Sequence, residues 1–159
     1  MAHFDKLFQV NKLNVSLHQL ERAILLFLDE SDFISALTLA GAAEEILGTY
    51  VKIKNREPCV VAQAKFLKDQ NLSELSEKEI KGLHLNLARN SLKHFHDEAE
   101  ENMSLSLETE AIALIVRGLD NVVKLEIKFS KAMNDFVLWV IKNRPDIANP
   151  ESGVEIVRP

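Results

Sequence analysis

The residues best suited to chemistry gather in one stretch, "ARNSLKHFHDE", residues 88–98. It holds two of the chain's five histidines, His94 and His96, together with Arg89 and Asn90. An imidazole ordinarily titrates near about pH 6.5, so it can take or give a proton around neutrality. A guanidinium can bind two phosphate oxygens through its forked N–H groups. These residue types in this order indicate proton transfer beside a bound phosphate.

A helix is expected to carry this stretch. Ser76 and Glu79 have the spacing of a capping box, which predicts a helix over residues 77–96. Its apolar positions recur at helical spacing and predict a buried stripe. The stripe consists of Ile80, Leu83, Leu87, Ala88, Ser91, Leu92 and Phe95.

The helical turn of about 100° per residue divides the polar side chains between two sides. Asn90 and His94, four residues apart, share a side at the margin of the stripe. Arg89, Lys93 and His96 fall on the opposite, polar face. An ordinary solvated face with one structural histidine at the core margin would give the same pattern, so both interpretations stay open.

The remaining periodic segments also indicate helices. A capping-box pattern at Ser16 and Gln19 opens the first one, and Ser31 or Asp32 can cap the second. The helices are expected at residues 16–30, 32–54, 59–70, 77–96 and 108–143, the last with a break near Gly118–Asn121. Phe136 and Trp139 are expected in the core or at a dimer contact. We therefore predict an all-α, single-domain, up-and-down bundle of four or five helices over residues 1–143, followed by a loose, proline-rich tail at 144–159.

Composition limits the possible classes. The chain has 159 residues, of which 47% are hydrophobic, and a formal net charge of −5. That charge argues against a broad nucleic-acid-coating surface but permits a local basic pocket. Cys59 is the only cysteine, and neither a long apolar leader nor a run of roughly 20 apolar residues is present. We expect a cytoplasmic protein with no membrane association.

The stretch "RNSLKH" resembles the R-x4-6-H motif, often with a polar residue after the arginine, of the HEPN superfamily. That superfamily consists of small helical bundles, commonly dimeric. Many of its members are metal-independent ribonucleases of toxin–antitoxin or other defence systems. The resemblance implies that Arg89, Asn90 and His94 are catalytic. We expect Lys93 and His96, which lie next to these residues in the sequence, to have supporting roles. It also implies a homodimer, an RNA or nucleotide ligand, and a cognate antitoxin or nucleotidyltransferase-type partner.

Metal-independent RNA cleavage needs a base, an acid and positive charge at the phosphorus. His94 suits the proton transfers, Arg89 suits the phosphate, and Asn90 can orient either the imidazole or the substrate. Arg89 and His94 point about 140° apart on a regular helix. Either the helix end distorts or two copies each supply part of the site, and the resemblance implies the second arrangement.

The chain also resembles an uncharacterised bacterial helical family. The shared segments are "QLERAI", "LTLAGAAEEIL" and "NSLKH", which fall between residues 17 and 97. In that family Asn90, Lys93 and His94 are the matching positions. This resemblance implies no established activity.

Two further groups bear on the site. "HFHDE" contains metal-ligand types, but His94 and His96 would diverge by about 200° on a helix, so we predict no metal and no cofactor. Glu44 and Glu45 are either solvated acids, or Glu44 reaches the histidine and fixes its tautomer. The alternative to an enzyme is a non-catalytic helical module that binds a partner protein or a nucleotide.

Overall fold

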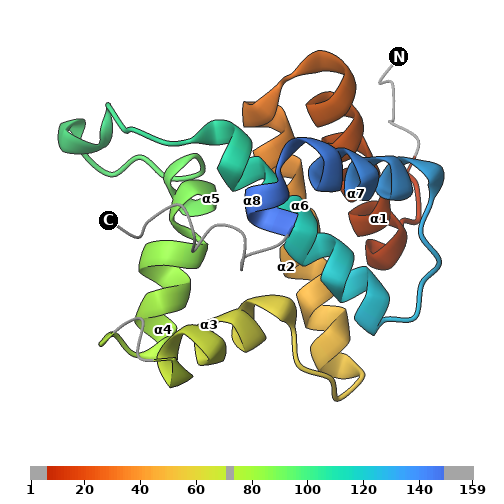
Figure 1. The fold of residues 1–159 in the computed structure, drawn as a ribbon, viewed down its shortest axis with the longest axis horizontal. Helices are drawn as coiled ribbons and strands as arrows, with labels where there is room; N and C mark the ends of the chain where they lie inside the picture. Colours follow the sequence, from red (N-terminus) through yellow and green to blue (C-terminus); the bar gives the residue numbers. More distant parts are fainter. Residues whose placement is uncertain (1–6, 71–73, 149–159) are drawn as a thin grey trace, which may run out of the picture.

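The computed structural model describes residues 7–70 and 74–148, without the side chain of His84. Every regular element in these ranges is helical, so the prediction of an all-α chain is confirmed (Figure 1). The α-helices are α1 (Lys12–Leu25), α2 (Phe33–Ile53), α3 (Cys59–Asp69), α4 (Glu77–Ile80), α5 (Leu87–Ser91), α6 (Leu107–Lys124), α7 (Lys131–Asn143) and α8 (Pro145–Ala148). Two π-helical turns, η1 (Leu26–Glu30) and η2 (Lys81–Leu85), and one 3-10 turn, η3 (Glu98–Glu100), complete the described elements.

The core forms around α2, which packs mainly against α1 and α6. Small residues on α2, among them Ala36, Ala40 and Ala43, are fully buried and let the neighbouring helices approach closely. Helix α7 covers part of α1. There the Phe27 ring lies 5.4 Å from Phe136 and 4.9 Å from Trp139, centroid to centroid. Phe136 therefore belongs to the core, and the partly buried Trp139 packs against it.

Local signals predicted the boundaries of α2 and α3. The Asp32 carboxylate accepts a hydrogen bond from the Ser35 N–H (3.0 Å) and caps α2. Pro58 stands at the N-cap of α3, where its missing N–H costs nothing. Helix α1 begins earlier than predicted because Asn11, and not Ser16, caps it: the Asn11 side chain accepts from the Asn14 N–H. Ser16 lies buried inside the helix, and its hydroxyl donates to the Leu13 carbonyl (2.8 Å).

The predicted helix over 108–143 is two helices, and the break lies at residues 125–130, not near Gly118–Asn121. Glu126 adopts a left-handed conformation (φ 59°), which ends α6. Gly118 remains helical, and Leu20 of α1 lies directly against it. A β-carbon there would stand 2.9 Å from Leu20 Cδ1, so this glycine permits close packing rather than a kink.

The predicted helix over 77–96 was wrong in its interior and at its end. The capping box is present, because Ser76 and Glu79 bond reciprocally at the start of α4. The helix then passes through the π-turn η2, is interrupted at Asn86, and ends at Ser91. Of the predicted stripe only Ile80 and Ala88 are buried. Its exposed members are Leu83, Leu87, Leu92 and Phe95.

This segment lies at one side of the molecule, where α4 and α5 (green in Figure 1) stand apart from the layer of α1 and α7. Near the C-terminal end of the described residues, α8 occupies the beginning of the predicted tail, and Ile147 packs against the core. Residues 149–159 lie outside the described part. None of the described helices is both long enough and apolar enough to cross a bilayer.

Candidate functional site

Arg89 lies inside the fold, not on the exposed face that helical periodicity predicted. Helix α5 crosses α2 at Gly41, and the aliphatic stem of Arg89 occupies the space that a side chain at position 41 would need. A β-carbon at Gly41 would be 2.7 Å from Arg89 Cγ and 2.8 Å from Arg89 Cδ. Only 13% of the Arg89 side chain is exposed. Its position therefore depends on a glycine of another helix.

The guanidinium of Arg89 faces two carboxylates of α2. Arg89 Nη1 lies 3.6 Å from Glu44 Oε2 and 3.5 Å from Glu45 Oε2. Glu44 is buried, whereas 58% of the Glu45 side chain is exposed. The interpretation of both residues as solvated acids was therefore wrong for Glu44. Its described charged partners are arginines, and not the histidine that it was considered to reach.

Arg117 of α6 completes this buried group. Its Nη2 lies 4.0 Å from Glu44 Oε2. It also donates hydrogen bonds to the Leu85 carbonyl (2.7 Å) and to Asn86 Oδ1 (3.2 Å). Burial raises the pKa of Glu44, and the positive charges of Arg117 and Arg89 oppose that rise. Arg117 thus ties α6 to the start of α5.

Sequence reasoning did not identify Arg117 as a site residue, although the sequence contained a signal. Leu114, Gly118 and Asn121 are spaced by four and three and lie on the buried face of α6. Arg117 stands three residues after Leu114, so it shares that face. An arginine at a buried helical position requires a charged or polar partner. The sequence signal was therefore a buried arginine that needs an acidic partner on a facing helix, which in the structure is Glu44 of α2.

Asn90 connects the buried group to the surface. Its side-chain oxygen accepts hydrogen bonds from Arg89 Nε and Nη2, both at 3.3 Å. The same residue borders a surface cavity of about 340 Å³. The arginine therefore helps to hold the asparagine that faces this cavity.

The two histidines come together because the helix has already ended. After Ser91 the chain turns, with the His94 N–H donating to the Asn90 carbonyl (3.1 Å). The rings of His94 and His96 lie 5.9 Å apart, centroid to centroid. A regular helix would have pointed them in nearly opposite directions. Both are exposed, so His94 does not lie at the margin of a buried stripe.

Glu100 holds His96 in place. Glu100 Oε2 accepts a hydrogen bond from the His96 backbone N–H (3.0 Å) and lies 3.1 Å from His96 Nδ1. These bonds lower the pKa of Glu100, the backbone bond contributing most. The carboxylate is thus ionised at neutral pH and can compensate a positive charge on the imidazole.

One cavity brings together Asn90, His94 and His96 but not Arg89. Its other lining residues are Ser91, Glu100, Asn102 and Met103. Lys93 is exposed and, with His94, borders an adjacent hollow. Arg89 lies behind Asn90. The arrangement can therefore bind a polar ligand between two imidazoles, with a lysine nearby.

The described side chains give no sign of a metal centre. Within residues 7–70 and 74–148, no group of three or more His, Cys, Asp or Glu side chains could hold an ion. The pair formed by His94 and His96 has one carboxylate, Glu100, beside it.

Comparisons of the chain with protein-family models, with curated proteins and with solved structures gave no match.

Proposed function

We propose that the cavity at the end of α5 binds the phosphodiester of an RNA and that His94 and His96 transfer the protons that cleave it without a metal ion. The proposal keeps the HEPN-like assignment suggested by "RNSLKH". The bundle of four or five helices would then consist of α1, α2, α6 and α7, with α3 as the fifth. A nucleotide is the smallest ligand with the same phosphate and ribose chemistry.

The observation that carries the proposal is the joint position of two imidazoles on one cavity. Their ring centroids are 5.9 Å apart, and both border the hollow that Asn90 also faces. One imidazole can accept a proton while the other donates one, which is the division of labour that acid–base catalysis requires. A single histidine would have to perform both roles.

The reaction would be an in-line transfer. The ribose 2′-oxygen forms a bond to phosphorus as its proton passes to neutral His94. The bond from phosphorus to the 5′-oxygen breaks, and that oxygen takes a proton from the imidazolium of His96. The products are a 2′,3′-cyclic phosphate and a 5′-hydroxyl. His96 is assigned the acid role because Glu100 Oε2, 3.1 Å from His96 Nδ1, can accept the Nδ1–H while the other ring nitrogen gives up its proton.

Arg89 and Asn90 are positioning residues in this scheme. Arg89 would reach a phosphate only by leaving Glu44 and Glu45, its ion-pair partners at 3.6 and 3.5 Å. Through its bonds to Asn90 it instead fixes the amide that faces the ligand. Lys93 is exposed beside His94 and would supply positive charge to the phosphate. A homodimer would place a second copy beside this site.

The test is cleavage of a fluorescently labelled single-stranded RNA by purified protein. His94→Ala and His96→Ala should each reduce the cleavage rate by at least about a hundredfold, since a general acid or base typically contributes about 10²–10⁴. His18→Ala is the matched control, because His18 is exposed on α1. If all three variants cleaved the RNA at the same rate as the wild type, the cleavage would come from a contaminant. The proposal would then be refuted.

A second candidate is a non-catalytic module that binds a partner protein, of the antitoxin or nucleotidyltransferase type that the resemblance implies, or a nucleotide. It is favoured by four apolar side chains that stand exposed on residues 83–95, Phe95 the most at 68%. It predicts no cleavage by the wild type, together with a partner complex that Phe95→Glu dissolves. The circular dichroism spectrum of that variant should be unchanged.

A further inference from the structure

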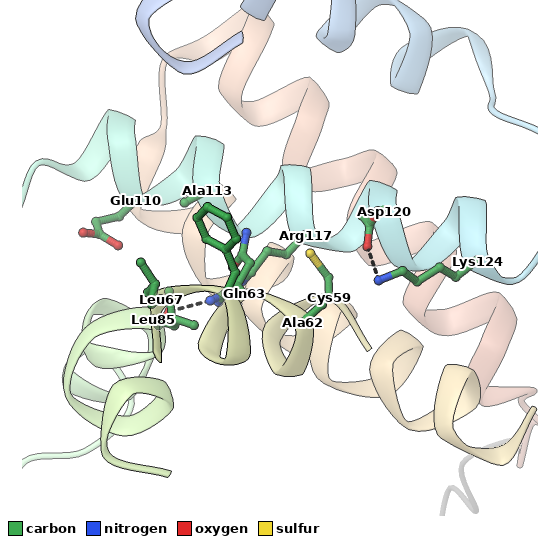
Figure 2. A pocket seen from close by; sticks show the side chains of 11 residues that line it. Cys59, Ala62, Gln63, Leu67, Leu85, Glu110, Ala113, Arg117, Asp120 and Lys124 are labelled. Carbon is green, nitrogen blue, oxygen red and sulfur yellow. Dashed lines mark hydrogen bonds and ion pairs between the residues drawn. The ribbon is translucent and has the colours of Figure 1, made fainter. Parts of the chain in front are cut away.

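A second and larger cavity, of about 660 Å³, lies between α3 and α6. None of its lining residues borders the cavity of His94. Its volume falls within the range of about 300–1,000 Å³ that is usual for small-molecule sites. Figure 2 shows α3 contributing Cys59, Ala62 and Gln63 to one wall. The opposite wall belongs to α6.

Arg117 lies in the middle of this cavity and has an unused donor. The residue is 2% exposed. Its two terminal nitrogens donate to the Leu85 carbonyl and to Asn86 Oδ1. Its Nε–H has no hydrogen-bond partner in the described part of the chain. A buried donor without a partner is unfavourable, and such groups are uncommon. A ligand acceptor beside Arg117 would satisfy it.

The charge around Arg117 favours an anionic acceptor. Arg117 and Arg89 share one buried carboxylate, that of Glu44, at 4.0 and 3.6 Å. The second carboxylate near Arg89, Glu45, is 58% exposed and is screened by water. One fully buried cation, Arg117, and one largely buried cation, Arg89, therefore share a single buried anion.

The other charged residues of the cavity lie towards its two ends. At one end Asp120 pairs with Lys124 Nζ at 2.7 Å, as Figure 2 shows. Glu110 stands at the opposite end. It makes no ion pair with Arg117 among the described contacts, but its negative charge opposes the fall in the pKa of Arg117 that burial causes. The guanidinium is thus the charged group that lines the middle of the cavity, and its Nε–H is the donor that a ligand could satisfy.

The walls around this charge are mainly apolar. They are formed by Ala62, Phe66, Leu67, Leu85 and Ala113. Burial raises the pKa of the Cys59 thiol to about 12, so at neutral pH this lining residue is a protonated thiol and not a nucleophile. Such surroundings suit reversible binding of an apolar molecule with one acidic end.

We propose that this cavity binds a small organic acid, whose carboxylate accepts a hydrogen bond from Arg117 Nε and whose apolar body lies against Phe66, Leu67 and Leu85. The inference does not rest on the proposed ribonuclease activity. It concerns a different cavity and can be tested without an RNA substrate.

The test uses two probes of the same shape, 1-naphthaleneacetate and the uncharged 1-naphthaleneethanol. Each is titrated into the full-length protein and followed by ¹H–¹⁵N correlation spectra and calorimetry. We expect the acid to bind at least about tenfold more tightly, as a hydrogen bond to a charged group implies. Amide shifts should concentrate in residues 59–67 and 110–124. Equal affinity for the two probes, no binding of the acid at millimolar concentration, or shifts elsewhere would overturn the proposal.

Two variants separate binding from folding. Ala113→Phe, at an exposed position of α6, would fill the cavity without disturbing the core and should abolish binding of the acid. Val116→Phe is the matched control, because this exposed residue of the same helix does not line the cavity. Its affinity should equal that of the wild type. Unchanged affinity in Ala113→Phe would overturn the proposal.

Arg117→Lys keeps the positive charge but loses the Nε–H and the fork, so it should weaken binding of the acid about tenfold or more. Its far-UV spectrum would first have to match that of the wild type, because Arg117 also holds Leu85 and Asn86. If this variant misfolds, the comparison of Ala113→Phe with Val116→Phe decides the outcome alone. A folded Arg117→Lys that binds the acid as tightly as the wild type would remove Arg117 from the site.

Discussion

Replacing Gly41 by alanine tests the position of Arg89 more directly than any change at the arginine itself. In the interior of a helix alanine is favoured over glycine by about 0.8–1.0 kcal/mol. At position 41, however, the new methyl group would stand 2.7 Å from Arg89 Cγ, and inserting a methyl group into a packed site typically costs about 1–3 kcal/mol. Gly41→Ala should therefore range from neutral to about 2 kcal/mol destabilising.

Gly48 is the matched control on the same helix. It is also buried, but a β-carbon there would meet its nearest described neighbours, Asn121 Nδ2 and Pro58 Cβ, at 3.6 Å. That is an ordinary contact distance, so Gly48→Ala should gain up to about 1 kcal/mol from helix propensity. Urea denaturation followed by circular dichroism at pH 7 should separate the two variants by about 1–3 kcal/mol.

Removing the arginine side chain supplies the decisive comparison. In an Arg89→Ala background the clash is absent, so Gly41→Ala should become stabilising by up to about 1 kcal/mol. The reasoning would be refuted if Gly41→Ala and Gly48→Ala had the same stability. The stem of Arg89 would then not lie on Gly41, and its guanidinium would be free to face a ligand.

Four further outcomes are expected. Because burial raises the pKa of Glu44 above 4.5, the folded protein retains a proton that the unfolded chain releases. The stability of the wild type relative to Glu44→Gln should therefore be greatest below about pH 4.5 and fall as the pH rises through the folded-state pKa of Glu44. If the stability difference between the two proteins grew with pH instead, the charges of the arginines would outweigh the effect of burial. Asn121→Ala should destabilise the fold by about 1–3 kcal/mol in urea titrations, because Asn121 Oδ1 accepts a hydrogen bond from the Cys59 N–H at 2.9 Å. Asn134→Ala, at an exposed position, is the control and should leave the free energy of unfolding nearly unchanged. RNA cleavage should survive EDTA, and sedimentation should show a dimer at micromolar concentration; a rate restored only by added zinc, or a monomer alone, would contradict these expectations.

The boundaries that could be predicted from the sequence are those fixed by neighbouring residues. Asp32 caps α2 with its own carboxylate, and Pro58 limits the chain just before α3. The capping box at Ser76 and Glu79 is equally local, and it marked the start of α4 correctly. Each of these signals acts within three or four residues, so it can be read without knowing the fold.

Apart from the start of α1, where the local cap is Asn11 and not Ser16, the errors in the position of the helix break and in the direction of Arg89 arose where contacts between distant segments decide the structure. Gly118 suggested a kink, but it is there because Leu20 of α1 lies against it. The true break, at residues 125–130, contains no glycine or proline to announce it. Similarly, periodicity placed Arg89 on the polar face, whereas its position depends on Gly41 of α2, 48 residues earlier. The arginine, asparagine and histidine of the site could be identified from the sequence. The direction in which each side chain points could not.

The π-turn η2 determines how α5 is rotated about its own axis. It thereby determines the directions of the side chains between η2 and the two histidines. A π-turn holds one more residue than the corresponding α-helical turn, and one residue corresponds to a rotation of about 100°. A deletion of one residue within Lys81–Leu85 could therefore be absorbed as a regular helix, but it would swing α5 around its axis. Arg89 would leave Gly41, and Asn90 would leave the cavity. A substitution in this segment leaves the rotation of α5 unchanged, whereas an insertion or deletion does not. The length of the segment should therefore be constrained more strictly than its residue types.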